Sequence, residues 1–237
     1  MTPADSTTDA QYTVTVDLQR RRQMSNALRR SSILLALFAL NTLLVTQAKW
    51  YRGIDEKLGN RGALYLKGLN HHLVLWLDNL GLRGLSATVL LIASLAISIR
   101  FKSWRPLNLA FLSLIALNLV VGALKVIIGR SKPLDGVDNF DVNGVGSYPS
   151  GHAANAVLTW GVLAYLIYRY THRALRRAKF LTVGVGVVTG IVAAISLFRN
   201  THWLSDLIGG VLIGAALLVL VMAVDRYVPS VKQPVQP

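Results

Sequence analysis

Six long apolar runs restrict this chain more than any other feature of its sequence. A helix needs about 20 mainly apolar residues to cross the hydrocarbon core of a bilayer. The runs are rich in Leu and Ala, and turn residues do not recur at hairpin spacing, so they do not suggest strands. The pattern predicts an all-α integral membrane protein with about six transmembrane helices. The predicted spans are residues 31–47, 84–99, 107–128, 153–170, 180–198 and 204–224.

The composition agrees with residence in a membrane. Apolar residues form 53% of the 237-residue chain and charged residues only 15%, whereas a soluble domain carries about 25% charge. These proportions argue against a soluble enzyme and against a disordered chain, which needs low hydrophobicity. The chain has no cysteine, which excludes disulfides, thiol catalysis and zinc–thiolate or iron–sulfur sites.

The net charge of +14 raises the question of nucleic-acid binding. The Lys and Arg residues lie in short clusters between the apolar runs, however, and not along one face of a soluble helix. Such clusters at membrane edges are typical of the positive-inside rule. We therefore expect the bilayer as a partner and no nucleic acid.

The same clusters predict the orientation of the chain in a plasma or inner membrane. With both termini in the cytoplasm, 15 of the 25 Lys and Arg residues lie on the cytoplasmic side, as the positive-inside rule favours. The predicted parts are a polar, basic cytoplasmic tail over 1–30, a six-span domain over 31–225 and a short cytoplasmic tail over 226–237. Residues 62–80 carry an irregular apolar face, which predicts one or two short helices in the outer interface.

The first group of unexpected polar residues lies at the end of the third predicted span. Lys125 and Lys132 are seven residues apart, which places them on one helix face about two turns apart, and Arg130 lies between them. Three cations this close repel one another unless an anion lies among them. The alternative is that the lysines extend from a helix end toward the headgroups.

Two further groups precede the fourth and sixth spans. Ser150, Gly151 and His152 open the fourth span, where free backbone N–H groups form an anion site. His202 and Asp206 are four residues apart before the sixth, so the carboxylate can orient the imidazole. Taken alone, the first of these groups is equally explained as a helix cap beside an interfacial histidine, and the second as a structural pair.

Together the three groups are more specific, because the six-span arrangement brings them to the same, extracytoplasmic side. Cations bind phosphate oxygens, one histidine can attack phosphorus, and the other can protonate the leaving oxygen. No carboxylate cluster of the kind that binds magnesium is present. We interpret Asp135, Asp138 and Asp141 as part of a turn-rich loop, because a calcium loop would need a distal Glu.

These motifs resemble those of the type-2 phosphatidic acid phosphatase superfamily, which also contains the vanadium haloperoxidases. The family's first motif is Lys, six residues, then Arg-Pro; it matches Lys125 through Lys132-Pro133, with lysine where arginine is usual. Arg130 fits the Gly-Arg that is frequent inside this motif. The second motif, Pro-Ser-Gly-His, is intact and ends at His152.

The third motif is Ser-Arg, five residues, His, three residues, Asp, and it departs more from the family pattern. Its His and Asp match His202 and Asp206, but its arginine falls on Ser196. Arg199 lies three residues before His202, and we expect it to replace the missing arginine in part. The alternative is that Arg199 only extends to the headgroups.

The resemblance implies a role for each matching residue. His202 would be phosphorylated transiently, Asp206 would orient it, and His152 would protonate the leaving group. Phosphate would be held by Lys125, Lys132, Ser150 and the N–H of Gly151. We expect Arg130 and Arg199 to bind the phosphate as well. It implies no cofactor and no metal.

The leading interpretation is a metal-independent phosphatase acting on a phosphate or diphosphate of a membrane lipid at the outer leaflet. By resemblance, the candidates are undecaprenyl diphosphate, phosphatidylglycerophosphate and phosphatidic acid. The same motifs also fit a phosphotransferase that passes phosphate to another lipid or sugar. Lys132 and the missing arginine leave open a degenerate member that binds lipid phosphate without turnover. A transporter would carry charges inside several spans, and only Lys125 approaches this.

Overall fold

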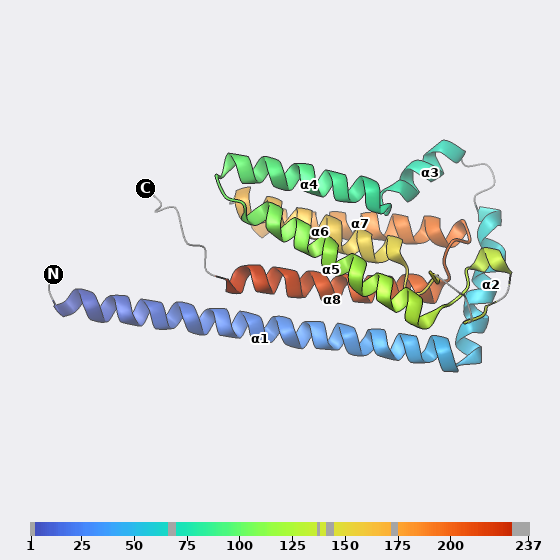
Figure 1. The fold of residues 1–237 in the computed structure, drawn as a ribbon, viewed down its shortest axis with the longest axis horizontal. Helices are drawn as coiled ribbons and strands as arrows, with labels where there is room; N and C mark the ends of the chain where they lie inside the picture. Colours follow the sequence, from blue (N-terminus) through green and yellow to red (C-terminus); the bar gives the residue numbers. More distant parts are fainter. Residues whose placement is uncertain (1–2, 66–69, 137, 141–144, 172–174, 229–237) are drawn as a thin grey trace.

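The computed structural model describes residues 3–65, 70–136, 138–140, 145–171 and 175–228. These residues form eight α-helices and one short 3-10 helix (Figure 1). In chain order the elements are α1 (Pro3–Gln47), α2 (Lys49–Tyr65), α3 (His71–Asn79), α4 (Arg83–Arg100), α5 (Arg105–Ile128), η1 (Pro133–Asp135), α6 (Gly151–Thr171), α7 (Leu175–Phe198) and α8 (Leu204–Tyr227).

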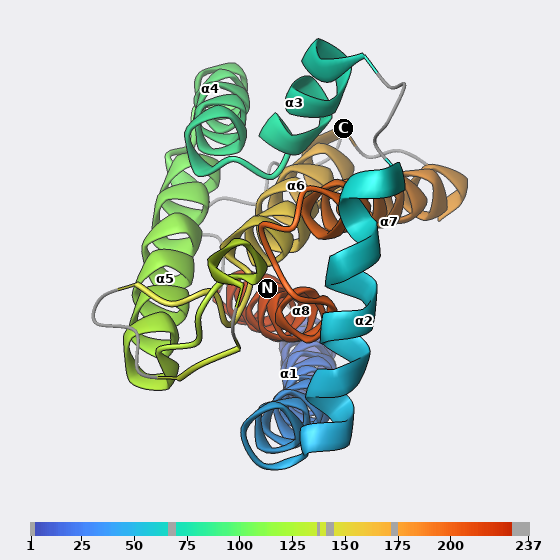
Figure 2. The ribbon, with the colours of Figure 1, turned by 90° about the vertical axis from the view of Figure 1, so that its right-hand side faces the viewer.

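Helix α6 is the centre of the bundle and packs against α4, α5, α7 and α8, while α1 lies along α8. The chain begins and α8 ends at one end of the bundle, which we call the terminal end (Figure 1). The loops that precede α6 and α8 meet at the opposite end, where α2 runs across the bundle (Figure 2). We call this opposite end the histidine end.

Small residues allow α6 and α8 to approach closely. A Cβ on Gly210 would lie 2.4 Å from the carbonyl oxygen of Ser150, and one on Gly214 would lie 2.7 Å from that of Ala154. Glycines four residues apart on a helix present a backbone surface to a neighbouring helix, as is common in membrane bundles. The close contact fixes the start of α6 against the first turns of α8.

The protein is a multi-pass membrane protein, and five of its described helical segments are long and apolar enough to cross a bilayer. These segments are Val16–Gln47, Arg83–Arg100, Arg105–Asp135, Ala178–Phe198 and Leu204–Tyr227. The fourth predicted span, 153–170, forms α6, which is long enough but less apolar because it carries polar residues such as Asn155 and Thr159. Both side chains are buried inside the bundle, so neighbouring helices and not lipid surround them.

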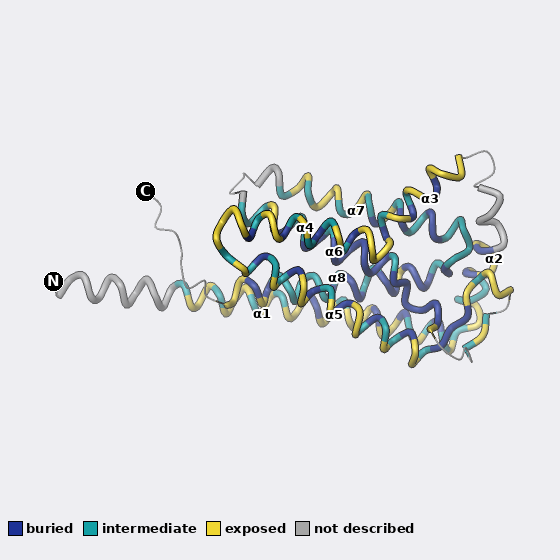
Figure 3. The backbone as a smooth tube through the Cα atoms, turned by 45° about the horizontal axis from the view of Figure 1, so that its top comes forward, coloured by how far each residue is buried: buried dark blue, intermediate teal, exposed yellow. Residues whose placement is uncertain are grey.

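The outward faces of the other helices carry large apolar side chains. Ile92 and Ile99 on α4, Leu119 on α5 and Phe180 on α7 are each more than 60% exposed. Buried residues concentrate along α6 and the beginning of α8 (Figure 3). An apolar outward surface, with polar side chains turned inward against other helices, fits a lipid environment.

The structure differs from the sequence prediction in the N-terminal segment. Residues 3–30, predicted as a tail, continue the helix of the first span without interruption from Pro3. Of the segment predicted as interfacial over 62–80, residues 62–65 are the end of α2, which begins earlier at Lys49, and residues 71–79 form α3. Residues 66–69 lie outside the described part of the chain. Residues 229–237 of the predicted C-terminal tail also lie outside it.

Candidate active site

The two histidines singled out by the sequence lie side by side at the histidine end. His152 is the second residue of α6, and His202 lies two residues before α8 begins. Their ring centroids are 6.0 Å apart with an interplanar angle of 59°. His202 is buried, with 7% of its surface exposed. The separation leaves room for a small group to contact both rings.

Asp206 lies in the first turn of α8 and contacts His202. Its Oδ2 lies 3.5 Å from Nδ1 of His202 and accepts a hydrogen bond of 3.2 Å from the backbone N–H of Trp203. The carboxylate is completely buried, at a helix N-terminus where negative charge is favoured. This arrangement fixes one ring nitrogen of His202 and leaves Nε2 for another partner.

The start of α6 is tied directly to the start of α8. The backbone N–H of Ser150 donates to the carbonyl oxygen of Asp206 over 2.9 Å, and the Ser150 hydroxyl accepts from the N–H of Ala153 over 3.3 Å. Within the described residues, the N–H groups of Gly151 and His152 donate to no other group. They point out of a helix start, which is the geometry of an anion site.

Lys125 anchors the segment that leads into α6. Its Nζ donates to the carbonyl oxygens of Gly146 and Ser147 over 2.7 and 2.9 Å, and the residue is only 7% exposed. Two of its three donors are therefore used, and one remains. Lys132 is exposed, and neither lysine forms an ion pair with a carboxylate among the residues that the structure describes.

Arg130, predicted as a phosphate ligand, has a different environment. Its guanidinium is fully buried and donates to Asp55, to both carboxylate oxygens of Asp138, and to Asp206 and Ser205. The donor–acceptor distances are 2.6–2.9 Å. These five hydrogen bonds use the whole donor capacity of a guanidinium. The geometry is at odds with direct phosphate binding, and it makes Arg130 a partner of the carboxylate that contacts His202.

Arg199, predicted to replace the missing arginine, also points to a carboxylate. Its Nη1 contacts Oδ2 of Asp78 at the end of α3. Ser196, where the family motif places arginine, is fully buried, and its hydroxyl lies 3.4 Å from Asp78. The side chains of positions 196 and 199 thus join α7 to α3.

Helix α1 supports the same end of the molecule through Tyr148. The Tyr148 hydroxyl accepts from the Asn41 side chain over 2.9 Å and lies 2.8 Å from the Thr42 hydroxyl. Burial raises the pKa of Tyr148 to about 12, so its hydroxyl stays protonated at neutral pH. Asn41 also donates to the carbonyl of Ser205 over 3.1 Å. A single polar residue on α1 therefore steadies the loops that carry both histidines.

Several residues of this site were not found by sequence reasoning. Asp55 lies on α2 and Asp78 on α3, and Asp138 lies in the loop interpreted as turn-rich. The chain has only 11 acidic residues, and of these three only Asp78 lies within an apolar stretch, where an acid is a signal of a buried partner. Asp141 lies outside the described residues. In the described part of the chain, no group of three or more His, Asp and Glu side chains is placed to hold a metal ion.

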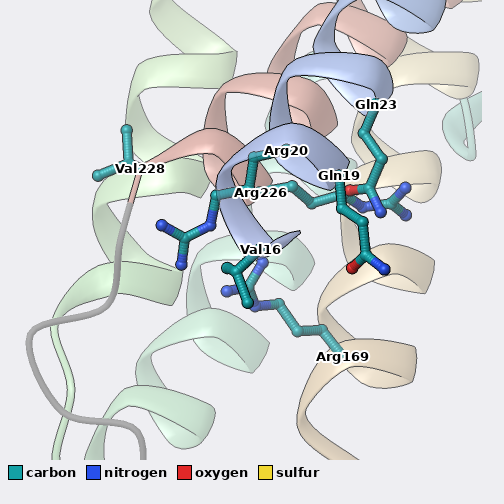
Figure 4. A pocket seen from close by; sticks show the side chains of 7 residues that line it. All are labelled: Val16, Gln19, Arg20, Gln23, Arg169, Arg226 and Val228. Carbon is teal, nitrogen blue, oxygen red and sulfur yellow. The ribbon is translucent and has the colours of Figure 1, made fainter. Parts of the chain in front are cut away.

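A pocket at the terminal end has a different character. Its volume is about 270 Å³, and it lies between the beginning of α1 and the ends of α6 and α8 (Figure 4). Its lining residues are Val16, Gln19, Arg20, Gln23, Arg169, Arg226 and Val228. The lining contains neither a histidine nor a carboxylate, so it offers no nucleophile and no acid–base pair.

The comparisons with known proteins point to one family. Residues 106–229 match the profile of the PAP2 superfamily. The chain is 28% identical over 87 residues to phosphatidylglycerophosphatase B of Bacillus subtilis (strain 168), a match that covers 37% of this chain and 43% of that protein. The fold of the present chain is similar to that in the crystal structure described as the first transmembrane PAP2 type phosphatidylglycerolphosphate phosphatase from Bacillus subtilis. The TM-score is 0.76 at 21% identity, over 86% of this chain and 99% of the other.

Proposed function

We propose that this chain, which belongs to the PAP2 superfamily, hydrolyses a phosphate ester or diphosphate of a membrane lipid without a metal ion. One observation carries the proposal: His152 and His202 lie 6.0 Å apart at one end of a membrane bundle, and Asp206 holds His202. Two imidazoles at this spacing provide a nucleophile and a proton donor on opposite sides of one phosphorus atom.

In the first step, Nε2 of His202 attacks phosphorus, and the bond from phosphorus to the lipid oxygen breaks. His152 transfers its proton to the leaving oxygen, while Asp206 stabilises the positive charge that develops on His202. In the second step, His152 takes a proton from water, the water oxygen attacks phosphorus, and the N–P bond breaks. Phosphate leaves, and both histidines return to their starting states.

The phosphate oxygens would be held by Lys125, Lys132, the Ser150 hydroxyl and the N–H of Gly151. Preorganised donors of this kind stabilise the charge of a transition state because they need no rearrangement during reaction. The lack of a carboxylate partner for Lys125 and Lys132 among the described residues supports this role. Phosphatidylglycerophosphate is the substrate that the partial likeness to phosphatidylglycerophosphatase B favours.

The experiment is a phosphate-release assay with purified protein in detergent over phosphatidylglycerophosphate, phosphatidic acid and undecaprenyl diphosphate, with a chelator present. We expect release from at least one lipid and strong inhibition by vanadate, which imitates five-coordinate phosphorus. His72→Ala is the matched control, because His72 is an exposed histidine on α3 away from the site. Activity that chelation removes and magnesium restores would contradict the mechanism.

We propose further that the histidine end faces away from the cytoplasm and that both termini lie in it. The arginines of α1, α6 and α8 around the pocket of Figure 4 support this orientation, since positive residues favour the cytoplasmic side. Single cysteines at Asn139 and Gln233 test it in intact cells, because the chain has no native cysteine. An impermeant thiol reagent should label the first and not the second, and the reverse result would invert the orientation.

A further inference from the structure

The site lacks one cation that the family motif leads us to expect. The motif position, Ser196, is fully buried beside Asp78, and Arg199 is bonded to the same carboxylate. Neither residue therefore presents a free positive charge to the space between the histidines. A phosphate that carries close to two negative charges is then left with Lys125 and the exposed Lys132.

Arg83, the first residue of α4, lies directly over the start of α6. A Cβ placed on Gly151 would be 3.0 Å from Nη2 of Arg83 and 3.7 Å from Cε of Lys125. The guanidinium and the lysine stem thus converge on the same open face of Gly151, whose backbone N–H is a proposed phosphate donor. A Cβ at position 151 would press on the end of the Arg83 side chain, so a residue larger than glycine would narrow the space between Arg83 and the start of α6.

The backbone around Arg83 is fixed to α6 by hydrogen bonds. The Trp160 indole donates to the carbonyl of Leu80 over 3.0 Å, and the Asn155 amide donates to that of Gly81 over 3.1 Å. Gly81 also packs on the second motif, because a Cβ there would lie 3.3 Å from Cδ2 of His152. Arg83 therefore extends from a turn whose position relative to His152 is set by buried polar contacts.

The charge of Arg83 is not neutralised by its neighbours. The Arg83 side chain forms no hydrogen bond or ion pair with any residue that the structure describes. Its positive charge instead acts against those of Lys125 and a protonated His152. Like charges held this close are costly unless an anion lies among them. Arg83 is exposed, so a bound anion can reach it.

We propose that Arg83 takes the place of the missing third-motif arginine and binds the phosphate of the substrate together with Lys125 and the N–H of Gly151. The inference rests on the proposed function, and it adds a residue from outside the three motifs. A guanidinium can bind two phosphate oxygens with paired N–H groups, which lysine cannot do. Arg83 thus supplies the bidentate contact that Lys132 and Ser196 do not.

The test compares Arg83→Ala, Arg83→Gln and Arg83→Lys with Arg100→Ala in the full-length protein in detergent. Arg100 is the matched control, since it is an exposed arginine at the other end of the same helix. Loss of one donor to a developing oxyanion costs about 100- to 1,000-fold in rate, and we expect a loss of this size in kcat/KM for Arg83→Ala and Arg83→Gln. Arg83→Lys should regain part of the activity, and Arg100→Ala should match the wild type.

A second readout measures anion binding without turnover. Inorganic phosphate and vanadate should raise the unfolding temperature of the wild-type protein, of Arg100→Ala and of His202→Ala, but not that of Arg83→Ala. Arg83→Gln is measured in the same way in case Arg83→Ala folds poorly, because glutamine keeps a polar end and much of the length of the side chain without the charge.

The possible failures differ from one another. Wild-type-like kcat/KM and wild-type-like phosphate stabilisation in Arg83→Ala, with His202→Ala inactive, would overturn the inference and leave the proposed function standing. Absence of phosphate release from every lipid would overturn the proposed function, whereas phosphate stabilisation that depends on Arg83 would still support the anion site. Absence of both would overturn the two together.

Discussion

One buried cluster of charged side chains lies at each end of this bundle, and the central residues of the two clusters have opposite charges. At the histidine end a fully buried arginine, Arg130, is surrounded by Asp55, Asp138 and Asp206. At the terminal end a buried carboxylate, Asp225, accepts from Arg105 and Arg169 and from the Tyr165 hydroxyl over 2.6 Å.

The clusters differ in what they leave unpaired. Asp225 and its two arginines bind α5, α6 and α8 to one another, and each partner is a structural contact. Arg130 instead contacts three carboxylates, whereas Lys125, Lys132 and Arg83 nearby form no ion pair with a carboxylate in the described part of the chain. One of those carboxylates, Asp206, also orients His202. A buried ion cluster can thus serve packing alone or, as we propose for the histidine end, leave beside it a surplus of positive charge that binds an anion.

The largest expected effect is at the histidine end. His202→Ala should abolish phosphate release, with a loss of at least about 10⁴-fold, because no other group can replace the nucleophile. His152→Ala should retain more activity on phosphate esters with good leaving groups than on lipids, because such esters need no proton donor. Phosphate release from both substrate types by purified single variants measures the difference. Equal residual rates for both variants on both substrates would contradict this division of roles.

Arg130→Leu should produce the next largest effect, on stability and on turnover together. It leaves the buried Asp55 and Asp206 without this cation, and Asp138 with only the Arg52 contact at 3.7 Å. Breaking a buried ion pair costs about 3–5 kcal/mol. Thermal unfolding in detergent measures the loss. If Arg130 positions Asp206, kcat should fall while the inhibition constant for phosphate stays near that of the wild type. A weakened phosphate affinity at unchanged kcat would instead favour the direct phosphate contact that the sequence predicted.

Asp225→Asn is the counterpart at the terminal end. Removing the charge weakens contacts to Arg105 and Arg169, whose side chains are 20% and 28% exposed and can turn to water. Hydrogen bonds to charged groups contribute about 1.5–3 kcal/mol, and we expect a loss of stability at the lower end of this range. Activity per folded molecule should be unchanged. A fall in kcat with intact folding would show that the two ends are coupled, and the contrast between the clusters would fail.

The arrangement of helices was largely predictable from the sequence, whereas the charge clusters were not. The apolar runs at 84–99 and 107–128 correspond closely to α4 and α5, because lipid requires apolar side chains over the whole length of a span. The run at 153–170 forms α6, but protein and not lipid surrounds it, so its polar residues cost little. The continuation of α1 through residues 3–30 has no such apolar signal.

The motif positions of the histidines followed from local spacing alone. The partners of Arg130 and Arg199 did not, because they depend on contacts across 75 and 121 positions of the chain. Spacing in one segment contains no information about which distant acid meets which arginine. The low number of acidic residues was the one usable signal, since each acid near an apolar segment needs a partner.

Arg199→Ala should have the smallest effect, and it separates Arg199 from Arg83. If Arg199 supplied the missing phosphate contact, its removal would cost about 100- to 1,000-fold in rate. In the structure, however, Arg199 pairs with Asp78, and the side chains are 30% and 12% exposed. Partly exposed ion pairs contribute about 0.2–1 kcal/mol, so we expect a slightly lower unfolding temperature and near-normal kcat/KM.

The control is a double-mutant cycle with Asp78→Asn, measured by thermal unfolding and by phosphate release. If Arg199 acts only through Asp78, the double variant should lose no more stability than either single variant, because the coupling is already broken. Activity should stay near normal in all three, in contrast to Arg83→Ala. A hundredfold loss of kcat/KM in Arg199→Ala that Asp78→Asn does not reproduce would indicate that Arg199 contacts the phosphate. Arg83 would then share the role that the missing arginine leaves open, and the histidine end would hold one more unpaired cation than the structure indicates.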